Sequence, residues 1–343
     1  MRSAFYLLAI GLLTSCSSID YLSIETYNPA EITFPENIGK ILVVNNAVPQ
    51  PEDIGCELTL FGTKQDTCHV KADSALFDAC QGLGKAMADV PFFDDVLLYH
   101  DATRKDDVYY EDTKLTPEQV TALCDETGAD AVISFDRLLF ESKKNVVAFA
   151  EGYIAGDISV LMSGVVRSYL PGRPTPVATV YMADSLFFSE SAYNQIVLDQ
   201  LLPSQEEALR ASGEYLGMKA SPNFVPHWTK ETRWFYSGIG TQWKEATAFA
   251  RSEKWENAAE RWKHLYENST GWKAQAKAAS NIALSYEMKS DLREAHEWAS
   301  KSRDLFKKNE GEESKNTKLQ TLYVEALLNR LRSDRKLNMQ FGK

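Results

Sequence analysis

Residues 240–332 constrain the fold more than any other part of this chain. The stretch contains no proline, carries few strand signals and is dense in alanine, lysine, glutamate and tryptophan. Two segments within it match at an offset of 37 residues, since Ala246, Phe249, Ala258 and Trp262 align with Ala283, Tyr286, Ala295 and Ala299. Small residues at helical spacing let helices cross closely, and an aromatic side chain fills the space between them. The pattern predicts a repeated pair of antiparallel helices.

The second copy resembles the tetratricopeptide repeat, a unit of two helices with a period of about 34 residues. The resemblance is carried by residues 281–302 (NIALSYEMKSDLREAHEWASKS), in which Ser290-Asp291 stands at the usual turn. It implies a concave surface that holds extended or helical peptides. The candidate interaction residues on that surface are four tryptophans, Trp255, Trp262, Trp272 and Trp298.

A second interpretation of these helices stays open. About three repeats are needed for independent stability, whereas the sequence shows two copies followed by one more helical segment at 315–332. Under this interpretation the helices pack against the rest of the protein and the tryptophans belong to a core. Just before the helices, Trp228, Arg233, Trp234 and Tyr236 form a cluster that we expect to seat the first helix, while a binding role for Arg233 is the alternative.

The preceding part of the chain alternates strand and helix patterns. Strands are expected at 40–46, 92–99 and 129–140, and helices at 71–89 and 116–127, with Thr116, Pro117 and Gln119 forming a capped start and Gly128 ending the second helix. A long hairpin follows at 159–170 and 175–188, and a helix at 193–216 ends the segment. The order predicts an α/β domain with a mixed sheet, followed by an all-α region, and hence a mixed α+β fold class.

The strand that starts after Gly128 carries a second resemblance. Its residues, Gly128-Ala129-Asp130-Ala131-Val132-Ile133-Ser134, are similar to a segment of the envelope α/β domain of CsgG-like and TolB amino-terminal proteins. The likeness is one of fold. It implies a protein-contact module of the cell envelope rather than a catalyst.

The first residues look like a bacterial lipoprotein signal. Arg2 precedes an apolar stretch at 4–13 that is too short to span a bilayer. Leu13-Thr14-Ser15-Cys16 then matches the lipobox, in which the cysteine sulfur receives diacylglycerol. We expect cleavage before Cys16, palmitate and diacylglycerol modification, and membrane attachment through the lipid. Because no Asp follows Cys16 directly, we expect the outer membrane, facing the periplasm.

Four cysteines remain after Cys16. Cys56 and Cys68 flank an expected hairpin, and a disulfide between them would close a short loop in an oxidising envelope compartment. Cys80 and Cys124 each fall in an expected helix, where they serve either as a second bridge or as small buried side chains. Four cysteines allow three pairings, and the sequence does not choose among them.

Composition and motifs exclude several functions. The net charge is −11 and no basic stripe interleaves with aromatic residues, so nucleic-acid binding is disfavoured. The five histidines are scattered without ligand spacing, and Gly82-Leu83-Gly84-Lys85 lacks the full phosphate-loop spacing. We therefore expect no metal, no cofactor and no enzymatic activity; a hydrolase with carboxylates assembled by the fold is the alternative.

The whole pattern resembles an uncharacterised Bacteroidota envelope lipoprotein family. The resemblance rests on residues 28–35 (NPAEITFP), on residues 41–46 (ILVVNN), on Pro226-His227-Trp228 with Arg233, and on the repeat-like tail. We expect a signal peptide at 1–15, a lipid-anchored linker at 16–36, an α/β domain at 37–221, a junction at 222–239, a tetratricopeptide-like domain at 240–332 and a tail at 333–343. The expected function is a periplasmic adaptor that binds a protein partner; the alternative is a glycan- or peptide-binding lipoprotein.

Overall fold

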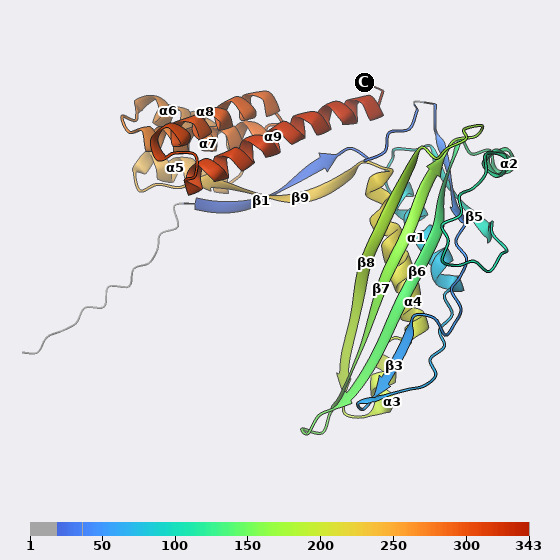
Figure 1. Ribbon diagram of the computed structural model, residues 1–343. Coiled ribbons are helices and arrows are strands. Elements are labelled where there is room, and N and C mark those ends of the chain that lie inside the picture. Colours follow the sequence, from blue (N-terminus) through green and yellow to red (C-terminus); the bar gives the residue numbers. More distant parts are fainter. Residues whose placement is uncertain (1–18, 36, 343) are drawn as a thin grey trace, which may run out of the picture. The chain divides into compact units, whose positions relative to one another are not determined.

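The protein consists of two compact units. The computed structural model describes residues 19–35 and 37–342 (Figure 1). A helical unit comprises the chain up to Asn28 together with Trp228–Lys336, and a sheet unit comprises Pro29–His227 with Leu337–Lys343. The expected mixed α+β fold, with a mixed sheet followed by helices, is confirmed. In the described part of the chain, no helix is long and apolar enough to cross a membrane.

The sheet unit is built on one seven-stranded sheet. Its elements are β2 (Lys40–Asn45), β3 (Cys56–Leu60), β4 (Thr63–Lys64), α1 (Asp73–Ala88), β5 (Asp95–Ala102), α2 (Pro117–Thr127), β6 (Ala131–Ala148), β7 (Ile154–Tyr169), β8 (Ala178–Ala192), α3 (Gln195–Leu201), α4 (Gln205–Ala220) and a short 3-10 helix, η1 (Ser221–Asn223). The long strand β6 pairs in parallel with β2 along its first part and with β3 along its second part. Its other edge pairs with β7, and β7 pairs with β8, both antiparallel.

The alternation of side chains along β2 explains the layers. Ile41 and Val43 point into a core that also contains α1 and α4, while Leu42 and Val44 point into a smaller core on the opposite face, against α2. A strand that is apolar on both faces requires cover on both sides. The sheet is therefore covered by α1 and α4 on one face and, at one end only, by α2 on the other. Figure 1 shows the long strands β6, β7 and β8 in front of α1 and α4.

Most local expectations for this unit are confirmed. Thr116 accepts a hydrogen bond from the Gln119 backbone and Gln119 returns one, and Gly128 ends α2 in a left-handed conformation at φ 71°. One expectation is wrong, because the helix foreseen at 193–216 is two helices. Pro203 lies in the break between α3 and α4, and Ser204 starts α4 with its own capping box. A proline inside a helix removes a hydrogen bond and clashes with the preceding turn.

Glycines in α1 and α4 serve close helix packing. A Cβ atom placed on Gly217 would overlap the backbone of Ala79, and one placed on Gly82 would overlap the backbone of Glu214. Gly82 and Gly84, which are part of the phosphate-loop-like GLGK sequence, are buried within α1. Gly82 and Gly217 let α1 and α4 pack closely, whereas Gly84 lies against Leu98 of β5. The GLGK sequence is helix rather than a phosphate-binding loop.

Among its described residues, the helical unit contains five helices and a two-stranded ribbon. The helices are α5 (Thr241–Arg251), α6 (Trp255–Asn268), α7 (Trp272–Met288), α8 (Leu292–Glu310) and α9 (Lys315–Gln340), and the ribbon pairs β1 (Ile19–Asn28) with β9 (His227–Tyr236). The matched residues of the two sequence copies fall on α5 and α6 in the first copy and on α7 and α8 in the second. Since α9 continues to Gln340, much of the expected tail at 333–343 is helix.

The ribbon replaces two expected segments of irregular chain. Residues 19–28, expected as part of a linker, form β1, and most of the expected junction at 222–239 forms β9. The two strands are about 200 residues apart in the sequence, and Thr26 contacts Thr229 across them at 3.0 Å between hydroxyl oxygens. A strand whose partner is this remote gives no local turn signal, which is why the pairing is absent from the sequence pattern.

Candidate binding surfaces

Strand β9 lies against the first helix of each helical pair. Phe235 packs with α5, α6 and α7, and Tyr236 packs with side chains of α7 and α8. The Tyr236 hydroxyl also accepts a hydrogen bond from Gln320 on α9. The protein's own ribbon thus occupies part of the surface of the helices.

One asparagine of α7 holds the backbone of β9. The side-chain oxygen of Asn281 accepts the backbone N–H of Tyr236, and its amide nitrogen donates to the Tyr236 carbonyl, both at 2.7 Å. Asn281 is completely buried. A side-chain amide that satisfies both backbone groups of one residue replaces the missing strand partner on that side. Such a contact holds an extended backbone whatever its side chains are, because it uses only backbone atoms of the strand.

We expect Asn281→Ala to loosen the end of β9. The substitution leaves the N–H and C=O of Tyr236 buried without partners, which should lower the free energy of unfolding of the helical unit by about 2 kcal/mol or more. Chemical denaturation followed by tryptophan fluorescence measures this, because all seven tryptophans lie between residues 228 and 298. Asn268→Ala, at an exposed helix end, is the control. Equal stability of the two variants would contradict the role given to Asn281.

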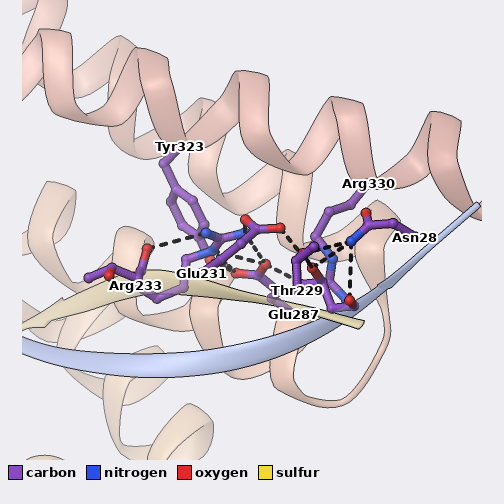
Figure 2. A network of polar contacts seen from close by, with 9 residues as sticks. Asn28, Thr229, Glu231, Arg233, Glu287, Tyr323 and Arg330 are labelled. Carbon is purple, nitrogen blue, oxygen red and sulfur yellow. Dashed lines mark hydrogen bonds and ion pairs between the residues drawn. The ribbon is translucent and has the colours of Figure 1, made fainter. Parts of the chain in front are cut away.

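A buried ion network joins β9 to two helices (Figure 2). The Glu287 carboxylate on α7 accepts from Arg233 of β9 at 3.0 Å and from Arg330 of α9 at 2.6 Å. Its second oxygen also accepts from the Tyr323 hydroxyl at 2.8 Å. The Glu287 side chain is 0% exposed and that of Arg233 is 5% exposed. The network therefore links three elements inside the unit.

The same network extends across the ribbon. Arg233 pairs with Glu231 at 2.8 Å, and Glu231 accepts from Thr26 of β1 at 2.8 Å. Asn28 then donates to Thr229 at 2.7 Å. Figure 2 shows these side chains converging between the strands and α9. The register of β1 against β9 is tied in this way to the helices.

The protonation of the network follows from its partners. Burial alone would lower the pKa of Arg233, but the hydrogen bonds and charge of Glu287 outweigh burial and raise that pKa. The pKa of Tyr323 is raised well above its usual value, first by burial and then by Glu287. Arg233 thus stays charged and Tyr323 stays a hydrogen-bond donor. The alternative binding role for Arg233 has no support here, since its guanidinium is buried among partners.

The four candidate tryptophans do not form an exposed surface. Trp262 is completely buried, and Trp255 and Trp298 are half-buried against the same core. Trp272 is half-buried and makes an edge contact with Phe306 at 6.1 Å between ring centroids. The expectation of an interaction surface is wrong for Trp262, because aromatic side chains fill the spaces between closely crossing helices. The core interpretation describes all four better.

The sheet unit has its own buried carboxylate. Asp136 of β6 is 0% exposed and accepts from Arg167 and Tyr169 of β7, each at 2.7 Å. It also accepts from Ser134 and, at 2.9 Å, from Asn46. A bulge in the pairing of β6 with β7 lies at this position. With four donors the carboxylate is saturated, so its role is to hold structure rather than to transfer protons.

This cluster fixes the long loop between β5 and α2. Arg167 pairs with Asp112 and donates to its carbonyl at 2.9 Å. Asn46 donates to the Thr113 carbonyl at 2.8 Å and accepts from Thr103 at 2.6 Å. The pKa of Asp112 is lowered, because the hydrogen bond and charge of Arg167 outweigh desolvation. Both ends of the loop are therefore attached to the sheet.

A cleft lies at the carboxyl end of β5. The chain after β2 enters α1 on one face of the sheet, and the chain after β5 enters α2 on the other face. Ligands of open α/β sheets bind at such a switch point. A cavity of about 630 Å³ is found there, lined by Tyr99, Asp101, Ala102, Thr103, Arg104, Lys105, Leu115, Gln119, Ala122, Leu123 and Glu126. Its lining combines apolar side chains with charges of both signs, which suits a polar organic ligand.

The opposite end of the unit leaves a sheet face uncovered. Along β8, side chains alternate between half-buried ones that face the helices and exposed ones on the open face. The largest exposed side chains are Tyr181, at 72% exposure, and Phe187, at 67%. Within the described residues, β8 pairs only with β7. One backbone edge of a 15-residue strand is therefore unpaired.

The cysteines of the sheet unit divide into one bridge and two thiols. Cys56 and Cys68 form a disulfide with a Cα–Cα distance of 5.6 Å, which holds the β3–β4 hairpin. Cys80 and Cys124 are free and buried in the cores on opposite faces of the sheet, so they do not pair. Burial, together with Asp125 and Asp130, raises the pKa of Cys124 to about 11.

Cys16, the expected lipidation site, lies outside the described residues. No cluster of metal-binding side chains occurs in the part of the chain that is described.

Fold and site together define a two-unit protein with buried structural ion networks and open sheet surfaces. The chain belongs to the family described as a domain of unknown function (DUF8603), whose model matches residues 38–236, more than half of the chain. A second model, also described as a domain of unknown function (DUF6340), matches residues 244–329. No curated protein matches the chain. The first match includes β9, although this strand packs within the helical unit.

Several residues that organise these surfaces were missed in the sequence. They are Asn281, Glu287, Tyr323 and Arg330 in the helical unit and Asp136, Arg167 and Tyr169 in the sheet unit. A signal was present for one of them, because Arg167 is a single charge in the otherwise uncharged second half of β7. A lone charge in such a segment requires a buried partner. The partner itself is set by strand pairing, which the segment alone does not specify.

Proposed function

We propose that this is a lipid-anchored envelope protein that binds an extended protein segment along β8. The observation that carries the proposal is the unpaired edge of this strand beside an uncovered face with Tyr181 and Phe187. An exposed edge offers a row of backbone donors and acceptors to another chain. Strand addition supplies affinity through these groups, and side chains on the face supply specificity.

The composition of β8 supports a binding role. Natural edge strands carry charged residues, prolines or bulges, and these features prevent pairing with another chain. From residue 178 to residue 189, β8 contains no proline, no lysine or arginine and a single acid, Asp184. That acid lies on the helix side, where it accepts from Tyr215 at 3.0 Å and pairs with Lys219. The edge of β8 therefore has few of the features that prevent pairing with a strand of another chain.

We keep the adaptor function expected from the sequence, but we assign its binding surface to the sheet unit instead of the helices. A tetratricopeptide-like origin of the helices agrees with the two helix pairs. The likeness to CsgG-like and TolB amino-terminal domains, and to a Bacteroidota lipoprotein family, supports an envelope setting. In this proposal the protein faces the periplasm from the outer membrane and has no catalytic role.

The lipid anchor belongs to the same proposal. β1 begins at Ile19, three residues after Cys16, and it packs within the helical unit. Three residues span at most about 11 Å when extended. A lipid on Cys16 would therefore hold the helical unit close to the bilayer surface, since residues 19–28 of the lipid-anchored linker expected at 16–36 form β1.

We expect Cys16→Ala to release the protein from membranes without unfolding it. Two or three acyl chains contribute about 0.8 kcal/mol per buried methylene, and all of this attachment is lost with the sulfur. Fractionation of cells into membrane and soluble parts, with incorporation of labelled palmitate, measures the effect. Ser17→Ala is the matched control. A Cys16→Ala protein that still fractionates with membranes would refute the anchor.

Site-specific photocrosslinking in living cells tests the binding surface. A photoreactive phenylalanine at position 181 or 187 should give a discrete crosslinked protein band. The same group at Leu322, which is 62% exposed on α9, is the control. The double substitution Tyr181→Ser and Phe187→Ser should reduce capture from a third position on the open face, Leu161, by about tenfold, as expected for loss of two interface aromatics. Identical bands from all positions would overturn the proposal.

A second candidate function is binding of a small polar ligand in the cleft beside α2. Its support is the position of the cavity at the switch point of the sheet, and its volume of about 630 Å³ lies in the range of ligand sites. Screening of glycans and short peptides by thermal shift tests it. Stabilisation that is abolished by Gln119→Trp, which fills the cleft, would favour it over strand addition.

A further inference from the structure

The sequence of β8 is nearly palindromic around Asp184. Three pairs of residues at equal distances on either side are matched in character: Ala183 with Ser185, Met182 with Leu186, and Tyr181 with Phe187. The next pair, Val180 and Phe188, is apolar on both sides. The matched set covers small, aliphatic and aromatic classes in order. A strand that reads the same in both directions is complementary to an antiparallel copy of itself.

The two faces of the strand make the match specific. Odd-numbered residues from 179 to 189 are exposed on the open face, and even-numbered residues from 178 to 188 are half-buried toward the helices. In a flat antiparallel pair, a residue on the open face must oppose a residue on the open face of the other strand. Because the open-face residues are all odd-numbered, the numbers of two opposed residues must have an even sum. Pairing about Asp184 meets this condition, and it opposes Tyr181 of one chain with Phe187 of the other.

We infer that the segment bound along β8 is β8 of a second copy, paired antiparallel about a two-fold axis at Asp184. This inference rests on the proposed function and names its partner. The pairing would join two sheets into one and form two aromatic pairs on the open face. Aromatic cross-strand pairs stabilise antiparallel sheets. On the helix side, Met182 and Leu186 would oppose each other twice.

The charge at the axis is balanced within each copy. Two Asp184 carboxylates would approach each other, and each is paired with Lys219 of its own chain and accepts from Tyr215. Two cations thus accompany two anions. The chain as a whole has a net charge of −11, which opposes contact between copies at most surfaces. The segment from 178 to 189 is free of that repulsion, since Asp184 is its only ionised side chain.

Other registers lose the match. A shift of two residues would place Tyr181 opposite Ser185 or Ser189 of the partner copy, with no aromatic contact. A shift of one residue would place side chains of the open face opposite side chains of the helix side. The palindrome therefore selects one register, and this register can be measured.

Disulfide trapping between two differently tagged copies tests the register. Ala183→Cys in one copy and Ser185→Cys in the other place facing residues at about 4.5–5.5 Å between Cα atoms, within reach of a disulfide. Ala183→Cys with Ser189→Cys is the matched control, with a separation of roughly 13 Å along the strand. The full mature protein in isolated membranes is oxidised after mixing. We expect at least about five-fold more mixed dimer from the facing pair, because disulfides tolerate little Cα displacement.

Each result decides between the two proposals. Equal yields from both pairs, or no mixed dimer from either, would overturn the inference. If photocrosslinking at 187 then gives a product whose mass is not twice that of this chain, strand addition survives with another protein as partner. If it gives no product, both proposals fall. A crosslinked product of twice the chain mass that forms from position 161 and is lost on Tyr181→Ser with Phe187→Ser would support both.

Discussion

Glu287→Ala is expected to lower the free energy of unfolding of the helical unit by about 3–5 kcal/mol, the range for breaking a buried ion pair from one side. The substitution removes the acceptor of Arg233, Arg330 and Tyr323 at once. The Arg233 side chain is buried and cannot reach water to compensate. β9 would lose its main polar tie to α7 and α9.

Chemical denaturation followed by tryptophan fluorescence measures the loss, since all seven tryptophans lie in the helical unit. Glu256→Ala is the control: this glutamate pairs with Lys289 but its side chain is 76% exposed, so solvent screens the pair and the free energy of unfolding should change little. Glu287→Gln should fall between the two, because it keeps hydrogen-bond acceptors without the charge. If Glu287→Ala matched Glu256→Ala, the network would be irrelevant to stability.

Asp136→Ala is expected to have a comparable effect on the sheet unit, about 3–5 kcal/mol by the same physical reasoning. Asp136 is the common acceptor for Arg167, Tyr169 and Asn46, all buried. Without it, Arg167 keeps only Asp112 as a charged partner, and Tyr169 loses its acceptor. The loop from 103 to 115 should loosen, because Arg167 and Asn46 hold it.

Hydrogen exchange resolved by peptide measures this loss in β2, β6 and the loop, which contain no tryptophan. Glu141→Ala is the matched control, an exposed acid on the same strand β6. Exchange in the loop should rise more than a hundredfold in Asp136→Ala, which corresponds to about 3 kcal/mol of opening free energy. Protection equal to that of Glu141→Ala would show that the carboxylate contributes nothing.

The surface of the helices on which β9 packs is already occupied. Asn281 and Glu287 of α7 hold β9 there with buried hydrogen bonds. An external peptide would have to displace a strand tied by charges and by two aromatic side chains, Phe235 and Tyr236. The edge of β8 demands no such exchange, which is the physical reason to place binding on the sheet unit.

Local chemistry determined much of the fold from the sequence alone. Thr116 and Gln119 specified the start of α2, Gly128 its end, and the apolar run of β2 a strand covered on both faces. The offset of 37 residues between matched small and aromatic residues specified two helix pairs. These features depend on neighbours within a few residues or on a repeat. Periodicity and capping therefore predict them.

Tertiary structure alone decided the rest. The pairing of β1 with β9 joins strands about 200 residues apart, and Glu287 meets Arg233 across 54 positions. Asp136 gains its partners through strand register and a bulge. Such contacts depend on which surfaces the folded chain brings together, so a residue's type shows that it needs a partner but not which partner it has. The open edge of β8 is of the same kind, since only the completed sheet shows that no described strand follows it.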